Sequence, residues 1–174
     1  MAALLGMGAT TARQRYLTRG IPTGLPEPVP LGGARLGVNV YLDAADDAEL
    51  RATLAEIRGT GIGTVKQAFP FREAHDWTAV DRIMAAAAAE SLIVVPLLDG
   101  DPQSAFAPPD PAAFATWAGA FAGRYGNQVD AYIVWDEPNL ASHWGGGPVN
   151  PNDYAALLSA AAAAIRAADP GAAI

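Results

Sequence analysis

Apolar residues gather in four short runs along the sequence, and each run is followed by a longer segment with helical spacing. The runs cover residues 36–42, 63–69, 92–98 and 129–135. The third run is almost continuously apolar, which is typical of a strand buried on both faces of a parallel sheet. The fourth is rich in β-branched and aromatic residues, again the composition of a buried strand. The pattern therefore predicts four strands.

The segments between the runs have apolar stripes and recognisable helix ends. Asp110 and Asn150 are each followed by proline, which combines an N-cap with a residue suited to the first helical position. Predicted helices cover about 46–59, 76–90, 110–126 and 150–169. Four strand–helix units in succession predict an α/β fold with a parallel sheet and right-handed crossovers. Residues 171–174 look like the opening of a fifth strand.

The first 34 residues lack this pattern. They carry Pro22, Pro26, Pro28 and Pro30 among glycines, and proline fixes φ and removes a backbone donor. We expect a flexible segment over 1–34 and a folded domain over 35–174. The apolar run 1–12 is too short to span a bilayer and lacks the positive start of a secretion signal, although it could be the tail of a signal or anchor that begins upstream.

Composition excludes several classes of function. The chain has 174 residues, a net charge of −7 and no cysteine. An acidic chain argues against nucleic-acid binding, which needs a basic surface. Without cysteine there is neither a disulfide nor a thiolate metal site, and His75 and His143 lack ligand spacing, so we expect no metal and no cofactor. No Gly-x-Gly-x-x-Gly follows any predicted strand, so a Rossmann arrangement loses its main support.

Two adjacent carboxylates follow the fourth apolar run, in the stretch Trp135-Asp136-Glu137-Pro138-Asn139. Pro138 cannot donate to a sheet ladder, so the chain leaves the sheet there. The carboxyl end of a parallel strand is where α/β barrels place catalytic groups. An acidic residue beside proline can equally start a turn.

These five residues resemble the Trp-Asn-Glu-Pro-Asn signature that ends the fourth strand of clan A glycoside hydrolases, particularly the cellulase-like and β-xylosidase-like families. The order of elements over 36–174 is also similar to the first four βα units of their (β/α)8 TIM barrel. The resemblance implies retaining hydrolysis of O-glycosidic bonds in a poly- or oligosaccharide, with Glu137 as the acid/base. In the family the nucleophile is a second glutamate, at the end of the seventh strand.

Length and resemblance conflict, because a complete barrel of this type needs ~250 residues. We therefore expect a truncated barrel that carries the acid/base half only, is inactive alone, and has the missing C-terminal half of the barrel as its partner. The acid role requires a carboxyl group that keeps its proton near neutral pH. An ionised Asp136 close by would favour that protonated form.

The resemblance also suggests substrate-binding residues. Asp136 stands where the family has an asparagine that hydrogen-bonds the sugar 2-hydroxyl, and an aspartate can accept from that hydroxyl but cannot donate an amide hydrogen. Lys66 and Gln67 lie where clan members carry a basic residue, and either could instead be structural. Asp99 ends the third strand, either at the same rim or as a plain turn residue.

Two further candidates follow the motif. Asn139 is a substrate ligand or a turn residue after Pro138. Trp144, next to His143 on the loop, offers an aromatic face on which a sugar ring could stack. The alternative function is a non-catalytic carbohydrate-binding pseudo-glycosidase, with Asp136 as the sign of lost activity. A third possibility is an unrelated βα protein. An extracellular or cell-envelope location for polysaccharide degradation follows from the resemblance alone.

Overall fold

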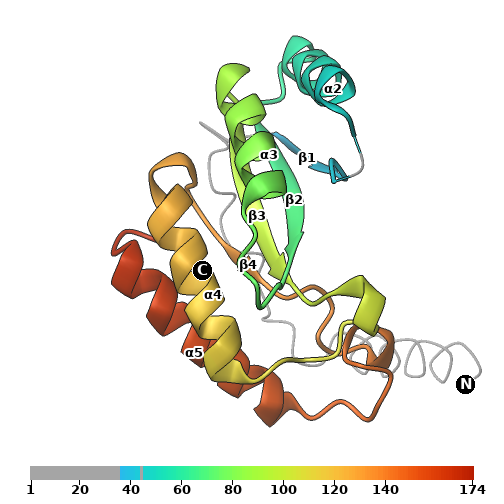
Figure 1. Ribbon diagram of the computed structural model, residues 1–174, viewed down its shortest axis with the longest axis vertical. Coiled ribbons are helices and arrows are strands. Elements are labelled where there is room, and N and C mark those ends of the chain that lie inside the picture. The colour runs from blue at the N-terminus through green and yellow to red at the C-terminus, as the bar shows by residue number, and fades with distance from the viewer. Residues whose placement is uncertain (1–35, 44) are drawn as a thin grey trace, which may run out of the picture. The chain divides into compact units, whose positions relative to one another are not determined.

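A parallel sheet of four strands forms the centre of the fold. The computed structural model describes residues 36–43 and 45–174, so the predicted flexible segment over 1–34 lies outside the described residues. The strands are β1 (Gly37–Val40), β2 (Thr64–Pro70), β3 (Ile93–Asp99) and β4 (Ile133–Val134). They lie side by side in chain order and every neighbouring pair is parallel, as predicted (Figure 1).

Four helices connect or follow the strands, as the spacing predicted. They are α2 (Asp47–Gly59), α3 (Thr78–Ala89), α4 (Pro111–Tyr125) and α5 (Pro151–Ala168). The capping predictions are confirmed: the Asp110 carboxylate accepts from Ala112 N and Ala113 N, and the Asn150 side chain accepts from Asn152 N. Short 3-10 turns follow at Pro102–Ser104, Gly126–Gln128 and Ala141–His143. Within the described chain, no helix combines the length and apolarity needed to cross a membrane.

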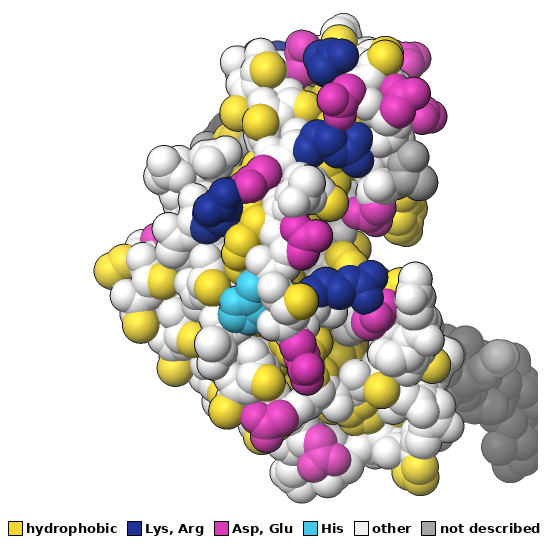
Figure 2. All heavy atoms as spheres, in the orientation of Figure 1, with side chains coloured by type: hydrophobic (Ala, Val, Ile, Leu, Met, Phe, Trp, Pro, Cys, Tyr) yellow, Lys and Arg dark blue, Asp and Glu magenta, His cyan; other side chains and the backbone are white. Residues whose placement is uncertain are grey.

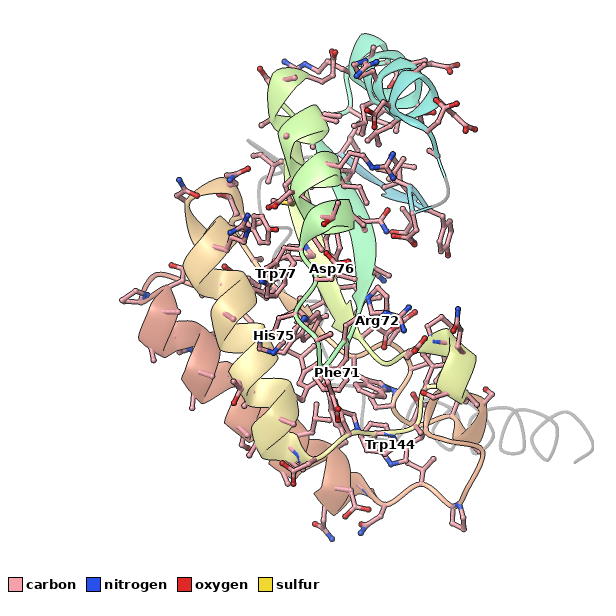
Figure 3. The ribbon with its side chains drawn as sticks, viewed as in Figure 1. Phe71, Arg72, His75, Asp76, Trp77 and Trp144 are labelled. Carbon is pink, nitrogen blue, oxygen red and sulfur yellow. The ribbon has the colours of Figure 1, made fainter. Side chains whose placement is uncertain are left out.

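The helix-covered face of the sheet holds a largely aromatic core. Phe69 of β2 packs on Phe121 of α4, with ring centroids 5.2 Å apart, and both side chains are buried. Trp77, just before α3 (Figure 3), stacks on Trp117 of α4, with ring centroids 6.4 Å apart and an interplanar angle of 9°. On the outside of these helices, acidic and basic side chains are interspersed (Figure 2). One pair of this kind is Asp81 of α3 with Arg124 of α4.

The fourth strand is shorter than predicted. The expected strand covered 129–135, but only Ile133 and Val134 pair with β3, opposite Leu97 and Leu98. Trp135 then adopts φ 67°, which ends the extended backbone. On its other side the segment meets the predicted fifth strand through a single parallel bridge between Ala131 and Ala173, with Tyr132 N donating to Ala173 O at 2.9 Å.

Candidate functional site

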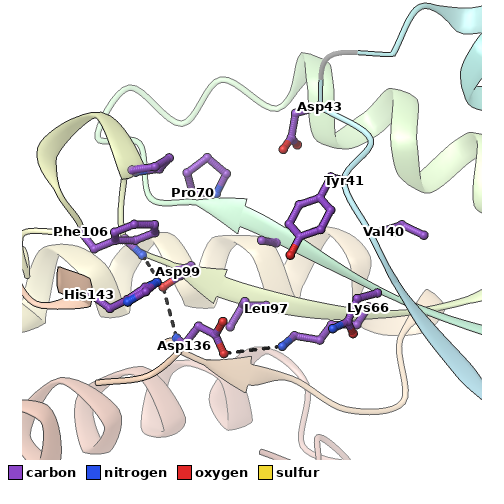
Figure 4. Close-up of a pocket in the computed structure, with 14 residues that line it drawn as sticks. Val40, Tyr41, Asp43, Lys66, Pro70, Leu97, Asp99, Phe106, Asp136 and His143 are labelled. Carbon is purple, nitrogen blue, oxygen red and sulfur yellow. Dashed lines mark hydrogen bonds and ion pairs between the residues drawn. The ribbon is translucent and has the colours of Figure 1, made fainter. Parts of the chain in front are cut away.

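A cavity of about 340 Å³ lies beside the carboxyl ends of the strands. Its walls come from the ends of β1, β2 and β3 and from the loops after β3 and β4 (Figure 4). Polar and aromatic lining side chains include Tyr41, Lys66, Asp99, Phe106, Asp136 and His143. Three of the predicted site residues, Lys66, Asp99 and Asp136, thus come together here from strand ends far apart in the chain.

Lys66 and Asp136 form an ion pair at this cavity. Lys66 Nζ lies 3.6 Å from Asp136 Oδ1, so the pair joins β2 to the turn after β4 (Figure 4). Both side chains remain partly exposed, at 28% and 45%. The ammonium offsets the negative charge of Asp136. Each side chain keeps polar atoms that a ligand can reach.

Gln67 does not lie at the cavity, so its predicted role as a substrate contact is wrong. Successive strand residues point to opposite faces, and Gln67 is on the helix side of β2, with no exposed surface. Its amide oxygen accepts from Leu42 N at 2.9 Å. Its amide nitrogen donates to Asp43 Oδ1 at 3.1 Å and Ala68 O at 2.7 Å. Gln67 thus fixes the end of β1 against β2.

Asp99 lines the cavity as a nearly buried carboxylate, 5% exposed. Its Oδ1 accepts from Gly100 N at 2.9 Å and from Asp136 N at 3.3 Å. Burial raises the pKa of the Asp99 carboxyl above its ordinary value. The neighbouring Asp136 charge raises it further, while the two backbone hydrogen bonds oppose the rise. The structure therefore brings Asp99 to the rim, which is one of the two positions that the sequence left open.

Glu137 is not one of the residues that line this cavity; its side chain is 53% exposed and meets the cavity only through His143. It follows a parallel strand, and no helix covers it. Its Oε2 lies 3.5 Å from His143 Nδ1, and the imidazole lines the cavity. Its backbone is left-handed, with φ 45°. The carboxylate is accessible to a ligand from outside, whereas its neighbour Asp136 faces the cavity interior.

Trp144 is buried, so it does not provide the predicted platform for a sugar ring. It is 5% exposed and contacts Trp135 edge-on, with ring centroids 5.0 Å apart (Figure 3). Tyr154 of α5 covers it from another side, at 6.1 Å. The position of Trp144 in a loop suggested that it is exposed, but its indole ring packs in the core against Trp135 and Tyr154. Asn139 is exposed in the turn after Pro138, and its binding role stays a prediction.

Two aromatic residues at the cavity were not among the predicted site residues. Tyr41, just after β1, lines the cavity and is 85% exposed. Phe106 lies in the Pro-rich loop after β3 and packs on His143 with ring centroids 4.8 Å apart. Tyr41 belongs to an apolar run and was treated as strand interior. No signal in the sequence marked this position, because β1 ends at Val40 in the structure and the predicted strand continued to residue 42.

No metal site is found among the residues that the structure describes. No group of three or more His, Cys, Asp or Glu side chains converges there. The chemistry available at the cavity is that of carboxylates, one ammonium, one imidazole, the side-chain amide of Asn39 and two aromatic rings.

No protein-family model matches the sequence, and no curated protein matches it. Solved structures are similar in fold. One is described as a glycoside hydrolase (TM-score 0.59, 15% identity, covering 79% of this chain and 35% of that one). Another is an endo-1,4-β-mannanase from Rhizomucor miehei (TM-score 0.59, 10% identity, covering 78% of this chain and 54% of that one). A third is a β-glucuronidase from Parabacteroides merdae (TM-score 0.54, 10% identity, covering 78% of this chain and 17% of that one).

These similarities establish the fold. The described chain has an α/β fold of (β/α)8 TIM-barrel type and corresponds to part of the barrel of glycoside hydrolases, as predicted. It spans about half or less of the length of the structures that it matches.

Proposed function

We propose that this chain carries the acid/base half of a retaining glycoside hydrolase of clan A type. The observation that carries the proposal is the position of Glu137. It is an exposed carboxylate at the carboxyl end of a parallel strand, beside a cavity, in a fold shared with glycoside hydrolases. The stretch Trp135 to Asn139 supports the clan assignment through its resemblance to that clan's signature.

In the proposed reaction Glu137 donates a proton to the glycosidic oxygen as the leaving group departs. A second carboxylate, ~5 Å away, attacks the anomeric carbon and forms a glycosyl-enzyme. Glu137 then removes a proton from water, which releases the sugar. We propose that this second carboxylate comes from a further set of βα units, a C-terminal half of the barrel, and that residues 36–174 alone do not turn over substrate.

Around Glu137 the cavity residues would hold the sugar. Asp136 is placed to accept from a sugar hydroxyl, and Lys66 is placed to donate to one while balancing the Asp136 charge. Tyr41 supplies an exposed aromatic face, which suits the apolar face of a sugar ring. The alternative, a carbohydrate-binding pseudo-glycosidase, is favoured by Asp136 itself, because an aspartate cannot replace the amide donor of asparagine.

The first test is saccharide binding by the purified 174-residue chain. Titration calorimetry with xylo-, gluco- and manno-oligosaccharides should give saturable binding without product. Asp136→Ala should weaken it about tenfold, the loss expected when one hydrogen bond to a charged group is removed. Glu56→Gln, an exposed carboxylate on α2, is the matched control. Failure to bind any of these saccharides contradicts the carbohydrate assignment.

A second test separates enzyme from binder. When the chain is combined with a polypeptide that supplies the further βα units, hydrolysis of an aryl glycoside should appear and be abolished by Glu137→Gln. Binding without hydrolysis in that complete barrel supports the pseudo-glycosidase. Turnover by the 174-residue chain alone that depends on Glu137 contradicts the division of the active site between two halves.

A further inference from the structure

A single carboxylate oxygen joins the ends of β3 and β4. Asp99 Oδ1 accepts from the backbone N–H of Gly100, the next residue in the chain, and from the backbone N–H of Asp136, which follows the adjacent strand β4. The first contact is local, whereas the second crosses between two strand ends. Figure 4 shows the second contact at the inner wall of the cavity.

The segment that Asp99 contacts has an unusual backbone. Trp135 has φ 67° and Glu137 has φ 45°, so left-handed residues that are not glycine flank Asp136 on both sides. Such conformations are costly and persist only when surrounding contacts hold them. Trp135 is held by its N–H, which donates to Leu98 O at 2.9 Å, and by its indole Nε1, which donates to His143 O at 2.8 Å. Asp99 holds the next N–H along the chain.

We propose that Asp99 is a positioning residue, whose carboxylate fixes the turn 135–137 so that Asp136 faces the cavity and Glu137 lies against the cavity residue His143. Its importance for hydrolysis rests on the proposed function, while its effect on the turn does not. Asp99 acts through the backbone of Asp136 and needs no contact with a sugar. A charged acceptor suits this task because hydrogen bonds to carboxylates are stronger than those to neutral oxygens.

The ionisation of Asp99 makes the contact measurable. Asp136 and His143 face Asp99 from the segment after β4, Lys66 is paired with Asp136, and Asp43 lines the same cavity. Burial raises the pKa of Asp99, so its charge disappears at a higher pH than that of an ordinary carboxyl group. Lowering the pH should therefore weaken the contact with Asp136 N while the fold remains intact.

The experiment is a pH series of amide NMR spectra of the 174-residue chain carrying Asp136→Asn, which removes the side-chain titration of residue 136 itself. The amide proton of position 136 should shift with the same midpoint as the carboxyl carbon of Asp99. Adding Asp99→Asn should abolish this shift. Adding Asp43→Asn instead, at another carboxyl group that lines the cavity, should leave it in place.

Hydrogen exchange in the otherwise unmodified chain gives a second measurement. Asp99→Ala should speed exchange of the Asp136 amide roughly tenfold, and Asp99→Asn should restore part of the protection. If only Gly100 responds to Asp99, the carboxylate serves its own strand end and the proposal is wrong. A chain that binds no saccharide but shows the coupled shift overturns the proposed function and leaves the positioning role intact.

Discussion

The indole ring of Trp135 lies directly against the backbone of Gly100. A Cβ atom at Gly100 would be 2.7 Å from Cη2 and 2.8 Å from Cζ2 of that ring. The ring cannot move away easily, because Trp135 is 3% exposed and packs on Phe114 and Trp144. Glycine at position 100 is therefore required by the close approach of a neighbouring strand end.

Gly100→Ala should consequently destabilise the fold by about 1–3 kcal/mol, the usual cost of overpacking a filled site. Urea denaturation measures this change. The control is Gly59→Ala at the end of α2, where an added Cβ would meet nothing within 4 Å. Equal stability of the two variants would show that the ring can shift.

Phe121 of α4 is the centre of the aromatic core, and its truncation should be costly. It has no exposed surface and its ring lies 5.2 Å from that of Phe69 and 4.8 Å from that of Tyr125. Phe121→Ala should lower the free energy of unfolding by about 3–5 kcal/mol. Tyr41→Ala, at an exposed cavity wall, should change it by less than about 0.5 kcal/mol. A small effect at Phe121 would contradict the described packing.

Asp43 should make the fold less stable as the pH rises. Burial raises the pKa of this carboxyl above its ordinary value of 3.8, while hydrogen bonding to Gln67 opposes the rise. The folded state therefore binds the proton more tightly than the unfolded chain, and stability decreases as pH increases from about 3.8 through the folded pKa. Asp43→Asn should flatten this part of the stability–pH curve. An unchanged slope would show that Asp43 is solvated.

Asp81 should have the opposite pH dependence. Arg124 donates to its carboxylate at 2.8 and 2.6 Å, and the Tyr125 hydroxyl donates at 2.7 Å. These bonds lower the pKa of Asp81, so their stabilisation is present above the ordinary carboxyl pKa and is lost as the pH falls through the lowered value. The Asp81 and Arg124 side chains are exposed, so Asp81→Asn should cost less than about 1 kcal/mol at neutral pH.

Thermal unfolding at low and high salt tests the Asp81 prediction. Added salt should reduce the difference between the original chain and Asp81→Asn, because exposed charges are screened. Glu90→Gln, at the end of the same helix, controls for a change of net charge alone. A salt-independent difference would indicate that packing, and not charge, is responsible.

The sequence was most informative where structure depends on local chemistry. Asp110 and Asn150 each precede a proline, and both helices begin there because cap and proline act within one turn. The meeting of Lys66, Asp99 and Asp136 could also be predicted, since the carboxyl ends of parallel strands share one edge.

Three features depend on tertiary contacts and could not be predicted from the sequence: the burial of Trp144, the end of β4, and which of Lys66 and Gln67 faces the cavity. Trp144 is buried because α5 presents Tyr154 to it, and the sequence of the loop contains no sign of that contact. The early end of β4 follows from the left-handed backbone of Trp135, which is held by bonds to Leu98 and His143. Which of Lys66 and Gln67 faces the cavity depends on strand register, and a shift of one residue would exchange them.

Because Lys66 and Gln67 face opposite sides of β2, substitutions at these two adjacent residues should have different effects on the fold. Substitution of Lys66 should leave the fold intact, because Lys66 and its partner Asp136 are both partly exposed, so the ligand preference of the cavity can be altered at this position. Gln67 is fixed by its bonds to Leu42, Asp43 and Ala68. A library that varies this cavity should therefore include Lys66 and leave Gln67 unchanged, although the two residues are adjacent on one strand.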